Sequence, residues 1–329
     1  MADLSTKYMG FKLRNPIIAA SSGLTDTAEK VKNLEVNGAG AVVLKSLFEE
    51  QIMMEINSIT AGNLYNNYAE AEDYITYYTR KHSLDEYLRF VEESKELVDI
   101  PVIASINCFS VGQWVDFAQR IESAGADALE LNLFFMPGDQ KFSGAEIEDI
   151  YLDIIRSVRK NTNLPIAVKL STYFTGMADS LIKISKEEIS GMVLFNRFYN
   201  PDIDLENEEI VSSRIFSLPE EISNTLRWIG MVSDKVHCDL SASTGIVDGY
   251  DAIKALLVGA QTVQVASTLY KNTAKQIGVM QDQIETWMDK KGYQSLDEII
   301  GKLSYRKVSK PMIYERAQFM KYFSSHEKK

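Results

Sequence analysis

Short apolar runs of strand length recur along this chain, and a segment of helical period follows nearly every one of them. The runs are apolar at almost every position, which is typical of parallel strands buried on both faces. The eight runs cover residues 16–21, 41–45, 101–107, 128–132, 165–170, 191–196, 235–240 and 262–266. The helical segments cover 26–37, 83–97, 111–124, 145–161, 177–187, 219–231 and 249–258, and helices are expected from 267 onward.

Eight such units in one chain predict an α/β fold of the (β/α)8 TIM-barrel type. Two stretches, from 46 to about 82 and 197–217, exceed an ordinary loop and predict long βα insertions. The alternative is a doubly wound open sheet, but the first turn, SSGLTDT, lacks its GxGxxG fingerprint. The stretch LSTKYMGFKLRN is a candidate hairpin for the barrel floor. Seven prolines and no Gly/Ser-rich linker favour a single domain over 1–329.

The amino-acid composition of the chain limits the classes of function that it can have. The chain has 35 basic and 46 acidic residues, a net charge of −11, which disfavours non-specific binding to nucleic acid or anionic lipid. No signal-peptide core or membrane-spanning run is evident, so we expect a cytoplasmic protein. Two cysteines, Cys108 and Cys238, are too few for a disulfide framework or a Cys-rich zinc site, and three histidines lack metal-ligand spacing. We therefore predict no metal site.

Polar residues stand where the apolar runs end, and in a barrel these ends form the active-site face. They are Ser21, Ser22, Lys45, Ser46, Asn107, Asn132, Lys169 and Asn196. Any one Asn there can be a turn or helix-cap residue, but three at successive strand ends favour a binding site. A Lys that closes an apolar strand is expected to point into the mouth, where its charge needs an anionic partner. That partner is either Glu130 or another carboxylate, or else a ligand anion or electron-rich ring.

The last two units carry small polar residues after their strands, in Ser241–Gly245 and Ala266–Thr268. Small side chains allow a ligand to approach the backbone closely, and N–H groups at a helix start favour phosphate. Barrels often bind phosphate after strands 7 and 8, although each loop can also be an ordinary helix cap. The two loops together predict a phosphate site.

In their order and spacing, these motifs resemble the FMN-dependent dihydroorotate dehydrogenases, most closely the soluble class 1 branch. The stretches that carry the resemblance are NPIIAASSG, GAVVLKS, PVIASIN, GADALELNL, LPIAVKLS and DGYDAIKALLVGAQTVQVAS. The resemblance implies that FMN is contacted by Ala20, Ser21, Lys45, Ser46, Asn107, Asn132 and Lys169. It implies that the FMN phosphate is held by Ala242, Ser243, Gly245, Ala266, Ser267 and Thr268. It also implies that a pyrimidine substrate is contacted by Asn132 and Asn196. It places Lys45 beside both flavin and substrate, and Lys169 at the N1–O2 side of the flavin.

The substrate half departs from that family pattern. The family reads ELNLSCPN with a base Cys, whereas this chain reads ELNLFFMP and places Phe135, which cannot move a proton, at or next to the base position. Asn196 is followed by Arg197-Phe198-Tyr199 in place of small polar residues. The GLPN pattern is missing, and Asn63, Asn66 and Asn67 are its only candidate replacements. The catalytic base is therefore unknown, with Lys45 as an assisting residue and Arg197 as a candidate partner for a substrate carboxylate.

The sequence is compatible with three functions. The first is an FMN oxidoreductase acting on CH–CH donors, in its most specific form the oxidation of dihydroorotate to orotate in pyrimidine biosynthesis. The second is a paralogue that binds FMN and acts on another small planar substrate, or does not turn over. The third is a phosphate-binding lyase or isomerase without flavin. The resemblance implies a homodimer, and a separate electron-transfer subunit stays open.

Overall fold

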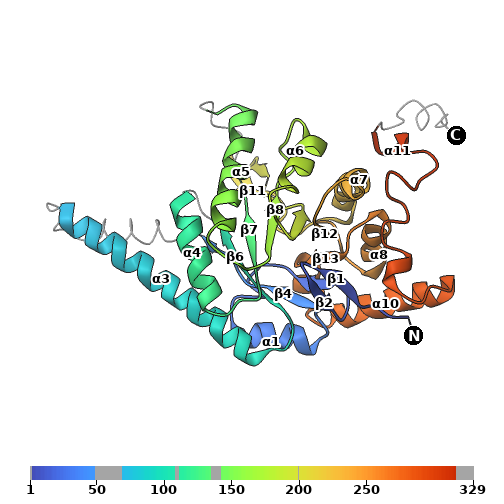
Figure 1. Ribbon diagram of the computed structural model, residues 1–329, viewed down its shortest axis with the longest axis horizontal. Coiled ribbons are helices and arrows are strands. Elements are labelled where there is room, and N and C mark those ends of the chain that lie inside the picture. The colour runs from blue at the N-terminus through green and yellow to red at the C-terminus, as the bar shows by residue number, and fades with distance from the viewer. Residues whose placement is uncertain (1, 49–68, 108–110, 135–141, 199, 316–329) are drawn as a thin grey trace.

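Eight parallel strands form a closed barrel in the computed structural model, which describes residues 2–48, 69–107, 111–134, 142–198 and 200–315 (Figure 1). The barrel strands are β3 (Ile17–Ala19), β4 (Ala41–Val43), β6 (Val102–Asn107), β7 (Ala128–Asn132), β8 (Ile166–Leu170), β9 (Gly191–Leu194), β12 (Asp239–Ser243) and β13 (Thr262–Val265). Parallel pairing of Val42 with Val102 joins β4 to β6 and closes the ring. The short β5 (Leu47–Phe48) continues that pairing along β6. The predicted (β/α)8 barrel is confirmed.

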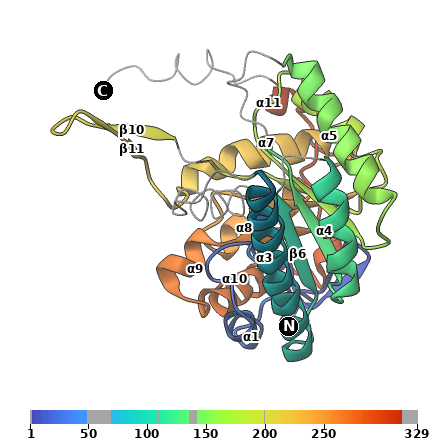
Figure 2. The ribbon, with the colours of Figure 1, turned by 90° about the vertical axis from the view of Figure 1, so that its left-hand side faces the viewer.

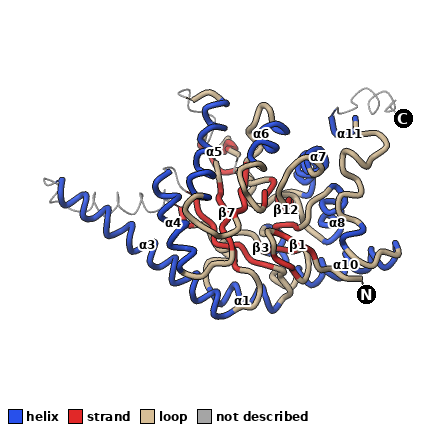
Figure 3. The backbone as a smooth tube through the Cα atoms, viewed as in Figure 1, coloured by secondary structure: helices blue, strands red, loops and turns tan. Residues whose placement is uncertain are grey.

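Helices surround the strands, as Figure 3 shows by colour. They are α1 (Ala28–Val36), α3 (Ala69–Leu97), α4 (Val111–Ser123), α5 (Gly144–Arg159), α6 (Met177–Ile184), η1 (Pro219–Glu221), α7 (Ile222–Val232), α8 (Gly249–Val258), α9 (Ser267–Asn272), α10 (Gln276–Lys291), η2 (Leu296–Glu298) and α11 (Met312–Glu315). Helix α5 shows how sequence sets such an element: Ser143 and Glu146 form a capping box at its start, and residues such as Ile154 and Val158 face the core. No helix in the described ranges is long and apolar enough to cross a membrane.

The predicted N-terminal hairpin is present, formed by β1 (Thr6–Tyr8) and β2 (Phe11–Leu13). Its two turn residues, Met9 and Gly10, both have positive φ, at 53° and 86°, which suits a tight two-residue hairpin turn. The hairpin seals the floor of the barrel, where its side chains join inward-facing strand residues in one apolar cluster. The cluster contains Tyr8, Met9, Leu13, Ile18, Ala41, Val43, Ile103, Ala128, Ala167 and Val193.

Both predicted insertions are present. The first, after β4, contains β5 and the start of α3, which begins at Ala69; the sequence had predicted its helix only from residue 83. The second, after β9, folds into the antiparallel hairpin of β10 (Pro201–Asp204) and β11 (Glu209–Ser212). Figure 2 shows this hairpin extending away from the barrel. Residues 49–68 lie outside the described part of the chain.

The seventh barrel strand differs from the prediction of 235–240, because β12 begins at Asp239 and runs to Ser243. Helix α7 continues to Val232, and the residues after it form the turn that leads into the strand. The end of β12 was missed because Ser241 and Ser243 carry small polar side chains, whereas a buried strand was expected to be apolar throughout. Ser243 therefore belongs to the strand, and the loop begins at Thr244.

Candidate active site at the barrel mouth

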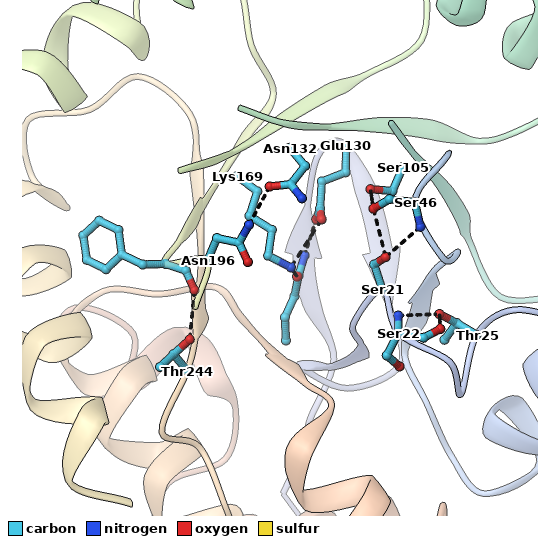
Figure 4. Close-up of polar contacts among 12 residues, drawn as sticks. Ser21, Ser22, Thr25, Ser46, Ser105, Glu130, Asn132, Lys169, Asn196 and Thr244 are labelled. Carbon is cyan, nitrogen blue, oxygen red and sulfur yellow. Dashed lines mark hydrogen bonds and ion pairs between the residues drawn. The ribbon is translucent and has the colours of Figure 1, made fainter. Parts of the chain in front are cut away.

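The inward-facing side chains of the barrel are apolar at its floor and polar at its mouth. Residues two apart in a strand face the same side, so Glu130 follows the floor residue Ala128, and Lys169 follows Ala167. Ser105 follows Ile103 in the same way on β6. These polar side chains converge above the floor (Figure 4).

Lys169 and Glu130 form a buried network with Gln264 of β13. The Lys169 Nζ atom donates to the Gln264 Oε1 atom at 3.0 Å, and the Gln264 Nε2 atom donates to the Glu130 Oε2 atom at 2.6 Å. The Lys169 Nζ atom also lies 3.4 Å from the Glu130 Oε1 atom. Only 7% of Lys169 and 1% of Glu130 are exposed. The ion pair and the shared amide give these two buried side chains polar partners, which burial of charged groups requires.

A cavity of about 470 Å³ opens beside this network. That volume lies within the range of small-molecule sites, roughly 300–1,000 Å³. The cavity is lined by Ala20, Ser21, Ser22, Gly23, Lys169, Asn196, Arg197, Ile215, Phe216, Ser217, Ser243, Thr244, Gly245, Ile246, Gln264, Ala266, Ser267 and Tyr270. Lys169 thus pairs with Glu130, one of the two predicted alternatives, and it also lines a ligand-sized space.

The two predicted phosphate loops form one wall of the cavity. Thr244 and Gly245 have φ values of 75° and 78°, so successive residues adopt the left-handed conformation. A Cβ atom on Gly245 would lie only 2.1 Å from the backbone nitrogen of Ile222, so only glycine allows this approach. Ala266 and Ser267 lie on the same wall, and the Ser267 hydroxyl accepts a hydrogen bond from the backbone N–H of Ser217.

Six of the predicted site residues in the described part of the chain do not line this cavity: Lys45, Ser46, Asn107, Asn132, Ala242 and Thr268. Ala242 packs outward in the helix-facing core, and the Thr268 hydroxyl donates to the carbonyl of Val247. Asn107 ends β6 beside β5. The Lys45 side chain is exposed to solvent in the loop after β4.

Ser21 and Ser46 belong to a chain of hydroxyl groups behind the cavity (Figure 4). The Ser21 and Ser46 Oγ atoms are 3.1 Å apart, and the Ser46 and Ser105 Oγ atoms are 2.7 Å apart. The Tyr87 hydroxyl donates to the carbonyl of Ser105, and burial raises the pKa of Tyr87. The phenol therefore stays protonated. The three serine hydroxyls contact one another, and Tyr87 joins them through the backbone N–H and C=O of Ser105.

The predicted substrate residues Asn132 and Asn196 meet directly. The Asn196 Nδ2 atom donates to the Asn132 Oδ1 atom at 2.7 Å (Figure 4). Arg197 turns away from them, and its Nε atom lies 3.0 Å from the Glu221 Oε1 atom. The Arg197 Nη1 atom donates to the carbonyl of Ile215. This side chain is thus already paired with a carboxylate.

Sequence reasoning did not select Gln264, included Thr244 only as part of the Ser241–Gly245 loop, and considered Glu130 only as an ion-pair partner. Glu130 and Gln264 each interrupt an otherwise apolar strand at an inward-facing position, and that interruption was the available signal. No comparable sequence pattern indicated that the cavity would also be lined by Ile215, Phe216 and Tyr270. The candidate base position Phe135, and Cys108, Asn63, Asn66 and Asn67, lie outside the described residues.

Comparison with known proteins agrees with this architecture. A family model described as dihydroorotate dehydrogenase matches residues 3–288. The chain belongs to the dihydroorotate dehydrogenase family. This family consists of oxidoreductases acting on CH–CH donors, as the resemblance implied.

Curated relatives match over nearly their whole length. A protein of Thermoplasma volcanium named dihydroorotate dehydrogenase B (NAD(+)), catalytic subunit, is 27% identical over 92% of this chain and 98% of its own length. Proteins of the same name from Thermoplasma acidophilum and Pyrococcus furiosus are each 26% identical, over 92% and 91% of this chain and 99% and 98% of their own lengths. The match therefore extends over the whole barrel.

Proposed function

We propose that this chain is an FMN-dependent oxidoreductase that transfers a hydride between its flavin and a small planar substrate. The observation that carries the proposal is the buried Lys169, held by Glu130 and Gln264, at the 470 Å³ cavity that the Gly245 loop also lines. The donor set suits FMN: a fixed cation for the ring and a wall of small residues for the phosphate.

Bound flavin would supply the two-electron chemistry of a CH–CH oxidation. The Lys169 ammonium would stand where negative charge develops on the ring, and such fixed charges are effective in a water-poor site. Ser243, Gly245, Ala266 and Ser267 would leave room for the phosphate. The amides of Asn132 and Asn196 would orient the substrate, because together they offer both donors and acceptors.

The substrate is proposed from the relatives, whose names state dihydroorotate dehydrogenation. Its most specific form here is the oxidation of dihydroorotate to orotate in pyrimidine biosynthesis. The alternative is another planar substrate or binding without turnover, and the sequence LFFM after Asn132 favours it, because Phe135 cannot act as a base.

The first test is the absorbance spectrum of the purified protein, before and after incubation with FMN. A yellow protein that retains flavin through gel filtration is expected. Anaerobic addition of dihydroorotate then separates turnover from binding alone, because only turnover bleaches the flavin. A protein that never carries flavin and cannot be reconstituted with it would contradict the proposal and favour a flavin-free lyase or isomerase.

We also propose a cytoplasmic homodimer that can pass electrons to a second subunit. The relatives are named as catalytic subunits, which supports a separate electron-transfer partner, and two-fold dimers are the commonest assembly. Sedimentation at micromolar concentration should show a species of twice the 37.1 kDa chain mass. A single 37.1 kDa species would exclude the homodimer.

A further inference from the structure

A tyrosine of the floor hairpin reaches into the barrel. Tyr8 ends β1 and is only 1% exposed, and the backbone N–H of the next residue, Met9, donates to the Asp239 Oδ2 atom at 2.8 Å. The Tyr8 hydroxyl lies against Gly191, where an added Cβ atom would be only 2.9 Å from the hydroxyl oxygen. Because Gly191 has no side chain, the hydroxyl fits inside the barrel at the start of β9.

The strand register places this hydroxyl in the same row as Glu130. Glu130 of β7 pairs with Ala167 of β8, and Ala167 pairs with Gly191 of β9, so these three residues form one row across neighbouring parallel strands. The inward-facing groups of the row are a carboxylate, a methyl group and a hydrogen atom. No larger side chain of this row therefore separates the Glu130 carboxylate from the Tyr8 hydroxyl.

Three oxygen atoms of this region are buried and have no hydrogen-bond partner among the residues that the structure describes. They are the Tyr8 Oη, Glu130 Oε1 and Ser241 Oγ atoms. Ser241 belongs to β12 and pairs with Val193, two residues after Gly191 on the neighbouring strand. Buried polar groups nearly always have a partner, and a bound water molecule commonly supplies one where protein atoms do not.

The Tyr8 hydroxyl is a donor in this group. Burial raises the pKa of Tyr8 well above its usual value, and the Glu130 carboxylate adds to the rise, so the phenol stays protonated. The Glu130 Oε1 atom is an acceptor that lies 3.4 Å from the Lys169 Nζ atom. A donor and an acceptor thus stand on two sides of the same small space.

We propose that one buried water molecule joins these three oxygen atoms and that Tyr8 thereby positions Glu130 for Lys169. The Tyr8 hydroxyl donates to the water oxygen, and the two water hydrogens bond to the Glu130 Oε1 and Ser241 Oγ atoms. Three hydrogen bonds are the usual number for a buried water. The water holds the carboxylate oxygen that faces the ammonium, so Tyr8 is a positioning residue that acts through Glu130.

This arrangement affects how much of the Lys169 charge is available to a bound flavin. A Glu130 oxygen that accepts from water is partly compensated. Without that hydrogen bond, the carboxylate would draw the ammonium closer and neutralise more of its charge, and negative charge on the ring would be less stabilised. This consequence rests on the proposed function, since it takes Lys169 as the cation beside the flavin.

A high-resolution crystal structure of the unmodified protein tests the water directly. Electron density should show one water within hydrogen-bond distance of the Tyr8 Oη, Glu130 Oε1 and Ser241 Oγ atoms. Density that shows no water in contact with both Tyr8 and Glu130 would overturn the inference. Neither result depends on flavin, so this test is separate from the test of the proposed function.

Urea denaturation of variants tests the link to Glu130. Tyr8→Phe should lower the folding equilibrium constant about tenfold, which corresponds to about 1.4 kcal/mol, because a hydrogen-bonded link to a charged group is lost. In a Lys169→Met, Glu130→Gln background, the same change should lower it about threefold or less, because the carboxylate is gone. Tyr250→Phe, at a tyrosine that is 48% exposed, is the matched control and should have no effect in either background. Equal losses from Tyr8→Phe in both backgrounds would contradict the link.

The flavin reduction potential of the holoprotein is the measurement that a purely structural role of Tyr8 would not change. Tyr8→Phe should shift the potential to a lower value and leave FMN retention unchanged, whereas Tyr250→Phe should change neither. An unchanged potential in folded, flavin-loaded Tyr8→Phe protein would overturn the positioning role.

Discussion

The floor and the mouth of this barrel are built from the same strands, but inward-facing side chains are apolar at the floor and polar at the mouth. At the floor, Leu13 and Met9 of the hairpin pack with inward-facing Ile18, Val43 and Ile103, and nearly all of the side chains there are apolar. At the mouth, the next inward positions hold ammonium, carboxyl and amide side chains beside a cavity. The floor stabilises the fold by burying apolar surface, whereas burying charged side chains at the mouth costs stability. Barrels of this fold usually separate a stabilising face from a functional face in this way.

The largest expected effect concerns catalysis at the mouth. If dihydroorotate is the substrate, hydride departure needs a base for its proton, and Phe135 cannot serve. General-base assistance is typically worth 10²–10⁴-fold, so flavin reduction by dihydroorotate should be slower than in a base-containing relative by about that factor. Anaerobic stopped-flow absorbance measures it. Rapid reduction with a pH dependence that reports a base would show that another residue replaces the Cys.

The next effect is the removal of the mouth's buried cation. Lys169→Ala leaves the Glu130 carboxylate unpaired, which is expected to cost about 3–5 kcal/mol in the free energy of unfolding. It should also weaken FMN retention or lower the flavin's reduction potential, because a cation beside the ring is lost. Urea denaturation and flavin content after gel filtration measure the two effects.

The double variant Lys169→Met with Glu130→Gln separates stability from function. It removes both charges, so it should recover most of the stability but not the flavin retention. The exposed Lys186→Ala is the matched control and should change neither. Full flavin retention and an unchanged potential in Lys169→Ala would show that this cation does not act on the cofactor.

At the floor, Leu13→Ala should affect stability alone. Leu13 is 1% exposed, and truncating a buried leucine typically costs 2–5 kcal/mol through lost burial and a cavity. The folded fraction should retain its ligand binding, because the floor lies below the mouth. Leu205→Ala, at a leucine that is 85% exposed, is the control and should leave stability nearly unchanged. Loss of flavin from folded Leu13→Ala protein would show that the two ends are coupled.

The smallest effect concerns a loop on the floor side, before β8. The Thr162 hydroxyl donates to Glu122 at 2.7 Å, and this hydrogen bond lowers the pKa of Glu122. A lowered folded-state pKa stabilises the protein above the unfolded value of 4.5, and that contribution is lost as pH falls through the folded-state value. Glu122→Gln should therefore be less stable at pH 7 by about 1 kcal/mol, and this difference should become smaller as pH falls below 4.5. An unchanged difference at pH 3 would contradict this.

Much of the fold could be predicted from the sequence, because the patterns that indicate its strands, helices and turns are local. Apolar runs, helical periods and the turn at Met9-Gly10 each lie within a few residues of one another, so the strand count and the floor hairpin could be predicted from sequence. Lys169, Asn132 and Asn196 were found because each ends or nearly ends an apolar strand. The prediction failed at β12, whose inward face is polar and so lacks the pattern of a buried strand.

The sequence by itself determined the barrel and the kind of residue at its mouth, whereas tertiary structure decided which of those residues meet. Gln264 lies 95 residues from Lys169 and 134 from Glu130, and only closure of the barrel brings the three side chains together. The stacking of Phe134 on Phe198 likewise depends on how two loops lie over neighbouring strand ends. Such contacts depend on register and side-chain direction in the closed ring, and no local pattern encodes these.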